Sequence, residues 1–218
     1  MQQDYTHISL VLDRSASMGA VRVEAEKAFN DFVSSQKQGP GKCTVSVWQF
    51  NNRVEQLVDM QPVASCPAFA LVPRGFTALL DAIGEAVDKT GQALAALAEE
   101  ARPGTVIVVI QTDGEENSSQ RFTADQIRDK IVEQREKYRW EFVFLGATED
   151  AIQTAATFGI RRDAAAEYSS TGGGVQAVGE VLTSGVNMLR SARASGQSSA
   201  VYQISAQQRK QLQAGDDA

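Results

Sequence analysis

The stretch Ile8–Ser17 reads ISLVLDRSAS, a short apolar run followed at once by Asp13, Ser15 and Ser17 at alternating positions. The apolar run is typical of a buried β-strand. In an extended segment alternating side chains point the same way, whereas residues i and i+2 of a helix do not share a face. The stretch therefore predicts a strand whose carboxyl end carries three oxygen-bearing side chains on one side of a loop.

Apolar strand patterns alternate with helical patterns along the rest of the chain. The run Thr105–Gln111 (TVIVVIQ) is uninterrupted and β-branched, which suits a parallel strand covered on both faces. We expect strands over Ile8–Leu12, Thr44–Phe50, Val54–Met60, Thr105–Gln111, Trp140–Leu145 and Ala165–Ser169. This order predicts an α/β fold, a Rossmann-like doubly wound sheet of about six strands with helices on both faces.

Two further segments place oxygen atoms at the same edge of such a sheet. Gly75–Leu79 (GFTAL) precedes a helical pattern, and Thr112-Asp113-Gly114 directly follows the expected strand Thr105–Gln111. Ligands of doubly wound sheets bind beyond the carboxyl ends of the strands, where the strand order reverses. If the strands ending at Asp13 and Asp113 are neighbours there, five side chains converge: Asp13, Ser15, Ser17, Thr77 and Asp113. Carboxylates and hydroxyls suit a hard divalent cation such as Mg²⁺ or Mn²⁺, whereas zinc prefers nitrogen and sulfur.

The charge of this set decides what it does with a bound ion. Two carboxylates at most balance a dication and the hydroxyls are neutral, so the ion stays electrophilic with a position open to solvent. An Asp or Glu carboxylate from a partner would complete its shell. A simpler interpretation is that Asp13, Ser15 and Ser17 only cap the following helix. Thr77 and Asp113 complete the set independently, which favours the metal site.

Residues beside these motifs are open to two interpretations. Arg14 and Phe76 flank the site and would contact a ligand if they are exposed, but either one is equally consistent with ordinary surface. Glu115 and Glu116 are expected to lie in a solvated loop.

At these motifs the sequence resembles the von Willebrand factor A domain family, over about residues 5–191. Within that family it resembles a stand-alone member of bacterial or phage type. The five residues match its metal-ion-dependent adhesion site (MIDAS). The resemblance implies a strand order of 3-2-1-4-5-6 with one antiparallel edge strand. It also implies that Ser15 and Ser17 ligate the ion directly, that Thr77 and Asp113 exchange direct and water-mediated contact, and that Asp13 acts through water. Mg²⁺ or Mn²⁺ is expected, and Ca²⁺ less so.

Length and composition set the remaining expectations. The chain has 218 residues and a net charge of −6, with basic residues interleaved among acidic ones, so we expect no nucleic-acid partner. We expect a von Willebrand factor A domain over residues 1–194 and a flexible tail over 195–218, in which Asp216 or Asp217 could fill the open position on the ion. Residues 1–7 show no signal segment and no run is long enough to span a membrane, so a cytoplasmic protein with reduced cysteines is expected, monomeric when isolated.

Three functions remain open from the sequence. The first is a metal-dependent binding module that captures an acidic residue of a protein partner. The second is an accessory subunit of an ATPase-driven remodelling or metal-chelatase complex, by family analogy. The third is a metal-assisted hydrolase, which is disfavoured because no general base or nucleophile accompanies the set. We therefore expect a protein that is not an enzyme.

Overall fold

The computed structural model describes residues 1–215 and contains one mixed β-sheet of six strands. The strand order is β3-β2-β1-β4-β5-β6, and only the β2–β3 pair is antiparallel. Both features confirm what the family resemblance implied. The strands are β1 (Gln2–Asp13), β2 (Lys42–Phe50), β3 (Val54–Pro62), β4 (Pro103–Thr112), β5 (Glu141–Gly146) and β6 (Ala165–Glu167).

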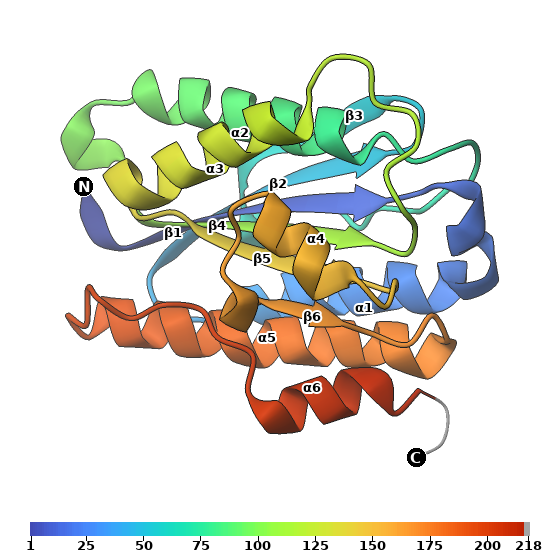
Figure 1. The fold of residues 1–218 in the computed structure, drawn as a ribbon. Helices are drawn as coiled ribbons and strands as arrows, with labels where there is room; N and C mark the ends of the chain where they lie inside the picture. The colour runs from blue at the N-terminus through green and yellow to red at the C-terminus, as the bar shows by residue number, and fades with distance from the viewer. Residues whose placement is uncertain (216–218) are drawn as a thin grey trace.

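Helices cover both faces of the sheet (Figure 1). One face packs against α1 and α5, and the opposite face packs against α2, α3 and α4. The helices are α1 (Arg22–Gln36), α2 (Leu79–Ala95), α3 (Ala124–Tyr138), α4 (Ala151–Thr157), α5 (Gly172–Ala194) and α6 (Ala206–Gln213). Short 3₁₀ helices are η1 (Ala16–Val21), η2 (Val63–Ser65), η3 (Glu99–Ala101) and η4 (Arg162–Ala164).

Strand β4 shows why its sequence is apolar without a break. Ile107 and Val109 belong to the core cluster on the α1/α5 side, whereas Val108 and Ile110 belong to the cluster on the α2/α3 side. Successive side chains of a strand point to opposite faces, so a strand covered on both faces needs apolar residues at every position. This two-sided burial fixes β4 in the middle of the sheet.

The order of the strands brings the predicted site residues to one edge. Strands β1 and β4 are parallel neighbours, and Leu12 pairs in register with Gln111. The residues that follow, Asp13 on β1 and Asp113 after β4, therefore leave the sheet side by side. In Figure 1 this edge lies at the tip of the β1 arrow, next to η1.

The C-terminal segment corrects the expectation of a flexible tail from residue 195. Tyr202 and Ile204 are buried, and they are followed by α6, whose Leu212 is also buried. The backbone N–H of Ser169 donates to the carbonyl of Leu212 at 2.9 Å. The apolar residues of this segment are too sparse to form a periodic pattern, so the sequence does not reveal that they pack. Asp216 and Asp217 lie outside the described residues.

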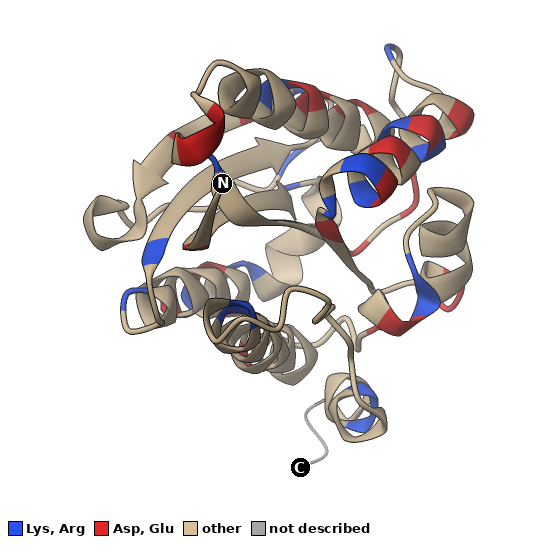
Figure 2. Ribbon diagram, turned by 90° about the vertical axis from the view of Figure 1, so that its left-hand side faces the viewer, with Lys and Arg blue, Asp and Glu red and all other residues tan. Residues whose placement is uncertain are grey.

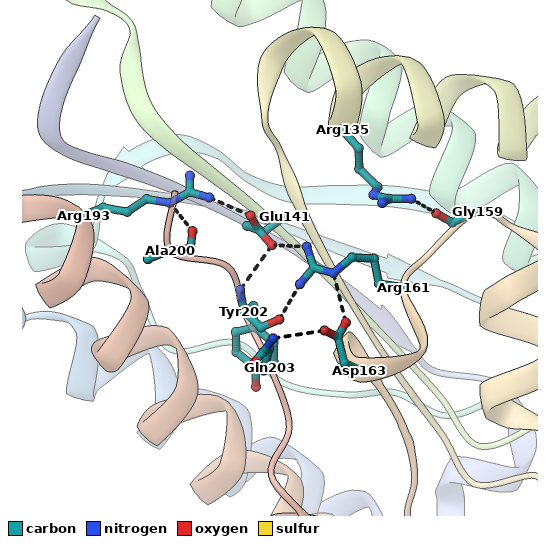
Figure 3. A network of polar contacts seen from close by, with 9 residues as sticks. All are labelled: Arg135, Glu141, Gly159, Arg161, Asp163, Arg193, Ala200, Tyr202 and Gln203. Atoms are coloured by element: carbon teal, nitrogen blue, oxygen red, sulfur yellow. Dashed lines mark hydrogen bonds and ion pairs between the residues drawn. The ribbon is translucent and has the colours of Figure 1, made fainter. Parts of the chain in front are cut away.

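A buried ion-pair cluster ties this segment to the sheet, and we call it the Glu141 cluster (Figure 3). The Glu141 carboxylate accepts hydrogen bonds from Arg193 Nη2 at 2.6 Å, from Arg161 Nη1 at 3.3 Å and from the Tyr202 N–H at 3.2 Å. The Tyr202 ring lies over Gly185 of α5, where an added Cβ would come within 2.6 Å of the ring. The contact therefore requires glycine at residue 185.

Charged residues of both signs alternate along α3 (Figure 2). Within residues 1–215, no helix combines the length and apolar character needed to cross a bilayer. Cys43 and Cys66 are both free thiols.

Candidate metal site

Three of the five predicted residues meet in direct contact beyond β1 and β4. Ser17 Oγ donates to Asp113 Oδ1 at 2.8 Å, and Ser15 Oγ donates to the same oxygen at 3.4 Å. The two serine hydroxyls lie 3.0 Å apart. Residues from two separate segments of the chain thus place three oxygens in one small triangle.

Asp13 supports this triangle from beneath instead of joining it. Its Oδ1 accepts the Ser15 N–H at 2.7 Å, and its Oδ2 accepts the Thr112 hydroxyl at 2.6 Å. Both oxygens are occupied by protein donors, and the side chain is fully buried. Asp13 therefore holds the serine loop and the end of β4 together.

Thr77 faces the same space from the loop just before α2. An ideal Cβ on Gly114 would lie 3.6 Å from Thr77 Oγ1 and 4.0 Å from Ser17 Oγ, so both hydroxyls point toward Gly114. Asn117 fixes the Thr77 backbone, because its side chain accepts the Thr77 N–H at 2.9 Å and its own N–H donates to the Thr77 carbonyl at 3.0 Å. Among the described residues, no hydrogen bond joins Thr77 to the other four. We call all five residues the oxygen cluster.

The alternative that these residues only cap a helix does not fit the geometry. Ser15 occupies the N-cap position of η1, yet its side chain makes no capping hydrogen bond. The Ser15 and Ser17 hydroxyls point toward Asp113, which lies 96 residues further along the chain than Ser17. A capping serine would bond the backbone N–H groups of its own helix.

The electrostatics of the cluster favour a cation. Burial raises the pKa of Asp13 to about 6, with a further increase from the nearby Asp113 carboxylate and opposing hydrogen bonds from Thr112 and Ser15. Burial also raises the pKa of Asp113. No lysine or arginine in the described part of the chain forms an ion pair with either carboxylate. Taking a carboxylate out of water without a counter-charge is unfavourable, and a bound dication would supply one.

Two of the three oxygen separations are those expected around a small octahedral ion. Ligands at ~2.1 Å from Mg²⁺ place neighbouring oxygens ~2.9 Å apart, whereas ligands at ~2.4 Å from Ca²⁺ place them ~3.4 Å apart. The three separations here are 2.8, 3.0 and 3.4 Å. The Ser17–Asp113 and Ser15–Ser17 separations match edges of a Mg²⁺ or Mn²⁺ shell, whereas the Ser15–Asp113 separation equals the longer value of a Ca²⁺ shell. Between Met1 and Gly215 no group of three or more His, Cys, Asp or Glu side chains is arranged for a metal.

Several contributors to the site were missed or misjudged from the sequence. The Thr112 and Asn117 side chains position Asp13 and Thr77, and no pattern in the sequence identifies either role. Arg14 is buried, at 7% exposure, and pairs with Glu55 at 2.8 Å, so it is not a free surface group. The Glu116 carboxylate accepts the Leu80, Ser118 and Ser119 N–H groups, which corrects the expectation of a solvated side chain.

Comparison with known proteins identifies the family. Residues 7–167 match the von Willebrand factor type A domain. This chain belongs to the von Willebrand factor type A domain family. The matched region contains the whole oxygen cluster. No curated protein sequence matches the chain.

Solved structures share the von Willebrand factor A fold with the chain. Proximal thread matrix protein 1 from the mussel byssus is 16% identical with a TM-score of 0.59, and the match covers 82% of this chain and 45% of that one. A von Willebrand factor type A protein from Catenulispora acidiphila is 14% identical with a TM-score of 0.58, covering 84% and 43%. The TRAP protein of Plasmodium vivax is 14% identical with a TM-score of 0.51, covering 78% and 70%. The chain thus spans less than half the length of the first two.

Two of these neighbours are described with divalent metals. One structure of the mussel protein has a zinc-occupied MIDAS motif, and the Plasmodium vivax structure is manganese-loaded. Identities this low establish the common fold alone.

Proposed function

We propose that this protein is a metal-dependent binding module whose oxygen cluster holds Mg²⁺ or Mn²⁺ as an intact MIDAS, and that the ion captures an Asp or Glu side chain of a protein partner. The observation that carries the proposal is the triangle formed by Ser15, Ser17 and Asp113, with only one carboxylate among its three oxygens. The one carboxylate of such a face neutralises only half of the charge of a dication. A carboxylate is the ligand that best neutralises it.

We also propose that the protein is not an enzyme. Asp13 has both carboxylate oxygens engaged by protein donors, so it is not available as a general base. The chain's single histidine, His7, is buried within β1 and contacts Thr44. Binding, rather than bond cleavage, is the chemistry that the remaining hydroxyls support.

Metal binding is tested by stability measurements on the full chain. At a Mg²⁺ concentration of 100 times Kd, binding to the native state adds ~2.7 kcal/mol, which corresponds to an increase in Tm of roughly 5–10 °C. EDTA should reverse the increase, and Asp113→Ala should abolish it. Asp59→Ala, which removes an exposed aspartate from β3, is the matched control and should keep the full response. A Tm that ignores both Mg²⁺ and EDTA would contradict the proposal.

Partner capture needs its own test. A library of displayed 12-residue peptides is selected on the immobilised protein in Mg²⁺, and bound peptides are eluted with EDTA. The eluted pool should be enriched in Asp or Glu at one position, and the Asp113→Ala protein should yield no such pool. A protein that binds Mg²⁺ but retains no EDTA-sensitive peptide would overturn capture while leaving the metal site in place.

A further inference from the structure

Two unpaired arginines lie beside the oxygen cluster. Arg53 follows β2 and Arg74 precedes α2, and together with four neighbours they line a pocket of about 280 Å³. The other lining residues are Arg14, Asn51, Asn52 and Gly75. Arg14 is neutralised by Glu55, whereas Arg53 and Arg74 are exposed and form no ion pair with any residue between 1 and 215.

The segment that carries Arg74 pairs directly with the metal loop. The Arg74 N–H donates to the Arg14 carbonyl at 3.0 Å, and the Ala16 N–H donates to the Gly75 carbonyl at 3.1 Å. Arg74 therefore lies alongside the loop that presents Ser15. It is also three residues before Thr77, so their Cα atoms are at most ~11 Å apart.

The turn between β2 and β3 fixes the position of this arginine. Asn51 Nδ2 donates to the Arg74 carbonyl at 2.9 Å, and Asn52 Oδ1 accepts the Phe76 N–H at 2.9 Å. Gly75 has a φ of +75°, and an added Cβ there would come within 2.0 Å of Asn52 Oδ1. Only glycine fits, so the backbone that carries Arg74 is set before any ligand arrives. A preformed site loses less entropy when it binds.

The positive charge of Arg53 and Arg74 is opposite to the charge that metal binding alone would favour beside the oxygen cluster. Positive side chains repel a nearby cation, and the protein as a whole has a net charge of −6, so basic residues are not needed to balance the molecule. An anion that contacts both the ion and the arginines would remove this repulsion. A guanidinium group binds carboxylates with two parallel hydrogen bonds, which makes a second carboxylate the natural ligand.

We propose that the Arg53/Arg74 pocket is a second recognition subsite, which binds a second acidic side chain of the same partner segment whose first carboxylate ligates the ion. This inference rests on the proposed function. An extended peptide advances ~3.3 Å per residue, so the two acidic residues are separated by roughly two to four positions. Phe76, which is 63% exposed next to Gly75, offers an apolar contact to the partner beside the pocket.

The peptide selection described above tests the subsite. Peptides eluted by EDTA from the unchanged protein should carry two acidic residues at a fixed separation. On Arg74→Glu protein, the second acidic position should change to Lys or Arg, while the first stays acidic. Arg128→Glu on α3 makes the same change in net charge at an exposed site on another element and should leave both acidic positions unchanged.

A direct binding measurement separates recognition from folding. Arg53→Gln with Arg74→Gln should weaken the selected peptide at least tenfold, while Mg²⁺ binding without peptide stays equal or becomes tighter because repulsion is removed. Weaker Mg²⁺ binding would mean that the arginines support the metal loop, which overturns the inference. A selected pool with one acidic position and no second would also overturn it, although capture by the ion would then stand.

Discussion

Buried carboxylates at opposite ends of the sheet differ in how their charge is balanced. Glu141 begins β5 and pairs with two guanidinium groups, those of Arg161 and Arg193, at the amino end of the strands. Asp13 ends β1 and accepts hydrogen bonds from the Thr112 hydroxyl and from Ser15, all uncharged donors, with Asp113 close by. Both side chains are almost fully buried, at 4% and 0% exposure.

The contrast separates a structural contact from the proposed metal site. The charge of Glu141 is neutralised by arginines of the protein itself, and Glu141 holds the C-terminal segment against the fold (Figure 3). At the oxygen cluster the protein supplies negative charge and no positive charge. The first arrangement is complete when the chain folds, whereas under the proposed function the second is completed by a cation.

The largest expected effect comes from removing the charge of Glu141. Glu141→Gln keeps the shape but leaves two guanidinium groups facing a neutral amide, one of them 7% exposed at its side chain. Breaking a buried ion pair by removing one partner costs about 3–5 kcal/mol. We expect a loss of that size in the free energy of unfolding, measured by urea denaturation, together with faster hydrogen exchange at the Tyr202 amide.

A matched control exists on α2. Glu85 also pairs with two cations, Lys89 and Arg121, but those partners are about half exposed. Glu85→Gln should therefore cost under about 1 kcal/mol. If both variants lose the same small amount, the Glu141 cluster does not anchor the C-terminal segment.

His7 tests whether burial alone, without charge balance, costs stability. Burial lowers the pKa of His7 to about 4, from an ordinary value of 6.5. A folded-state pKa below the unfolded one means that stability is complete above pH 6.5 and is lost as the pH falls toward 4. The shift corresponds to about 3 kcal/mol, which urea denaturation at a series of pH values will measure.

Comparison with His7→Leu isolates this contribution. The contribution of Asp13 to stability has the opposite pH dependence, because its raised pKa stabilises the fold at low pH. That contribution is the same in the unchanged protein and in His7→Leu. The difference between the two pH profiles should therefore grow only from pH 6.5 downward. Parallel profiles would show that His7 does not titrate in this way.

The fold was more predictable from the sequence than the contacts that complete it. Uninterrupted strands such as Thr105–Gln111 and the spacing of Asp13, Ser15 and Ser17 are local signals, so the sheet and the site edge follow from them. The Glu141 cluster joins residues that are far apart along the chain, and Tyr202 packs over Gly185 through a contact specified by shape alone. A single sequence carries no pattern that predicts contacts between such residues.

The side chains that position the site residues could not be predicted from the sequence, for a related reason. Thr112 and Asn117 act through hydrogen bonds to Asp13 and Thr77, and threonine and asparagine are common at strand ends and in loops. Their identity carries no signal without the geometry. That Ser15, Ser17 and Asp113 lie together could be predicted, because the spacing of oxygen-bearing residues after two strands is a local signal.

Asp13→Asn should raise the free energy of unfolding, whereas Glu141→Gln should lower it. The amide removes a buried charge and its repulsion with Asp113. Its oxygen can still accept the Ser15 N–H, and its NH₂ can donate to Thr112 Oγ1, which lies 3.0 Å from the Gly114 carbonyl and can bond there instead. Without metal, the variant should gain about 1–2 kcal/mol in unfolding free energy at neutral pH.

With Mg²⁺ the ranking of the same two proteins should reverse. The unchanged protein gains stability from the ion, whereas Asp13→Asn has lost part of the negative charge that attracts it. Tm measured with Mg²⁺ and with EDTA gives both comparisons in one experiment. A variant that is less stable than the unchanged protein in EDTA would show that Asp13 is balanced in the same way as Glu141.

The smallest expected effect concerns Thr112, which touches Asp13 but lies outside the oxygen cluster. Thr112→Val keeps the shape and removes the 2.6 Å hydrogen bond that orients Asp13 Oδ2. Residues that orient metal-site groups typically change metal affinity by about 10–100-fold, and we expect about tenfold weaker Mg²⁺ binding by calorimetry. Thr105→Val is the control on the same strand, because the Thr105 hydroxyl is buried without a hydrogen-bond partner in the described structure. Equal Mg²⁺ affinity in both variants would mean that Asp13 needs no orientation from β4, and that the serine loop alone forms the site.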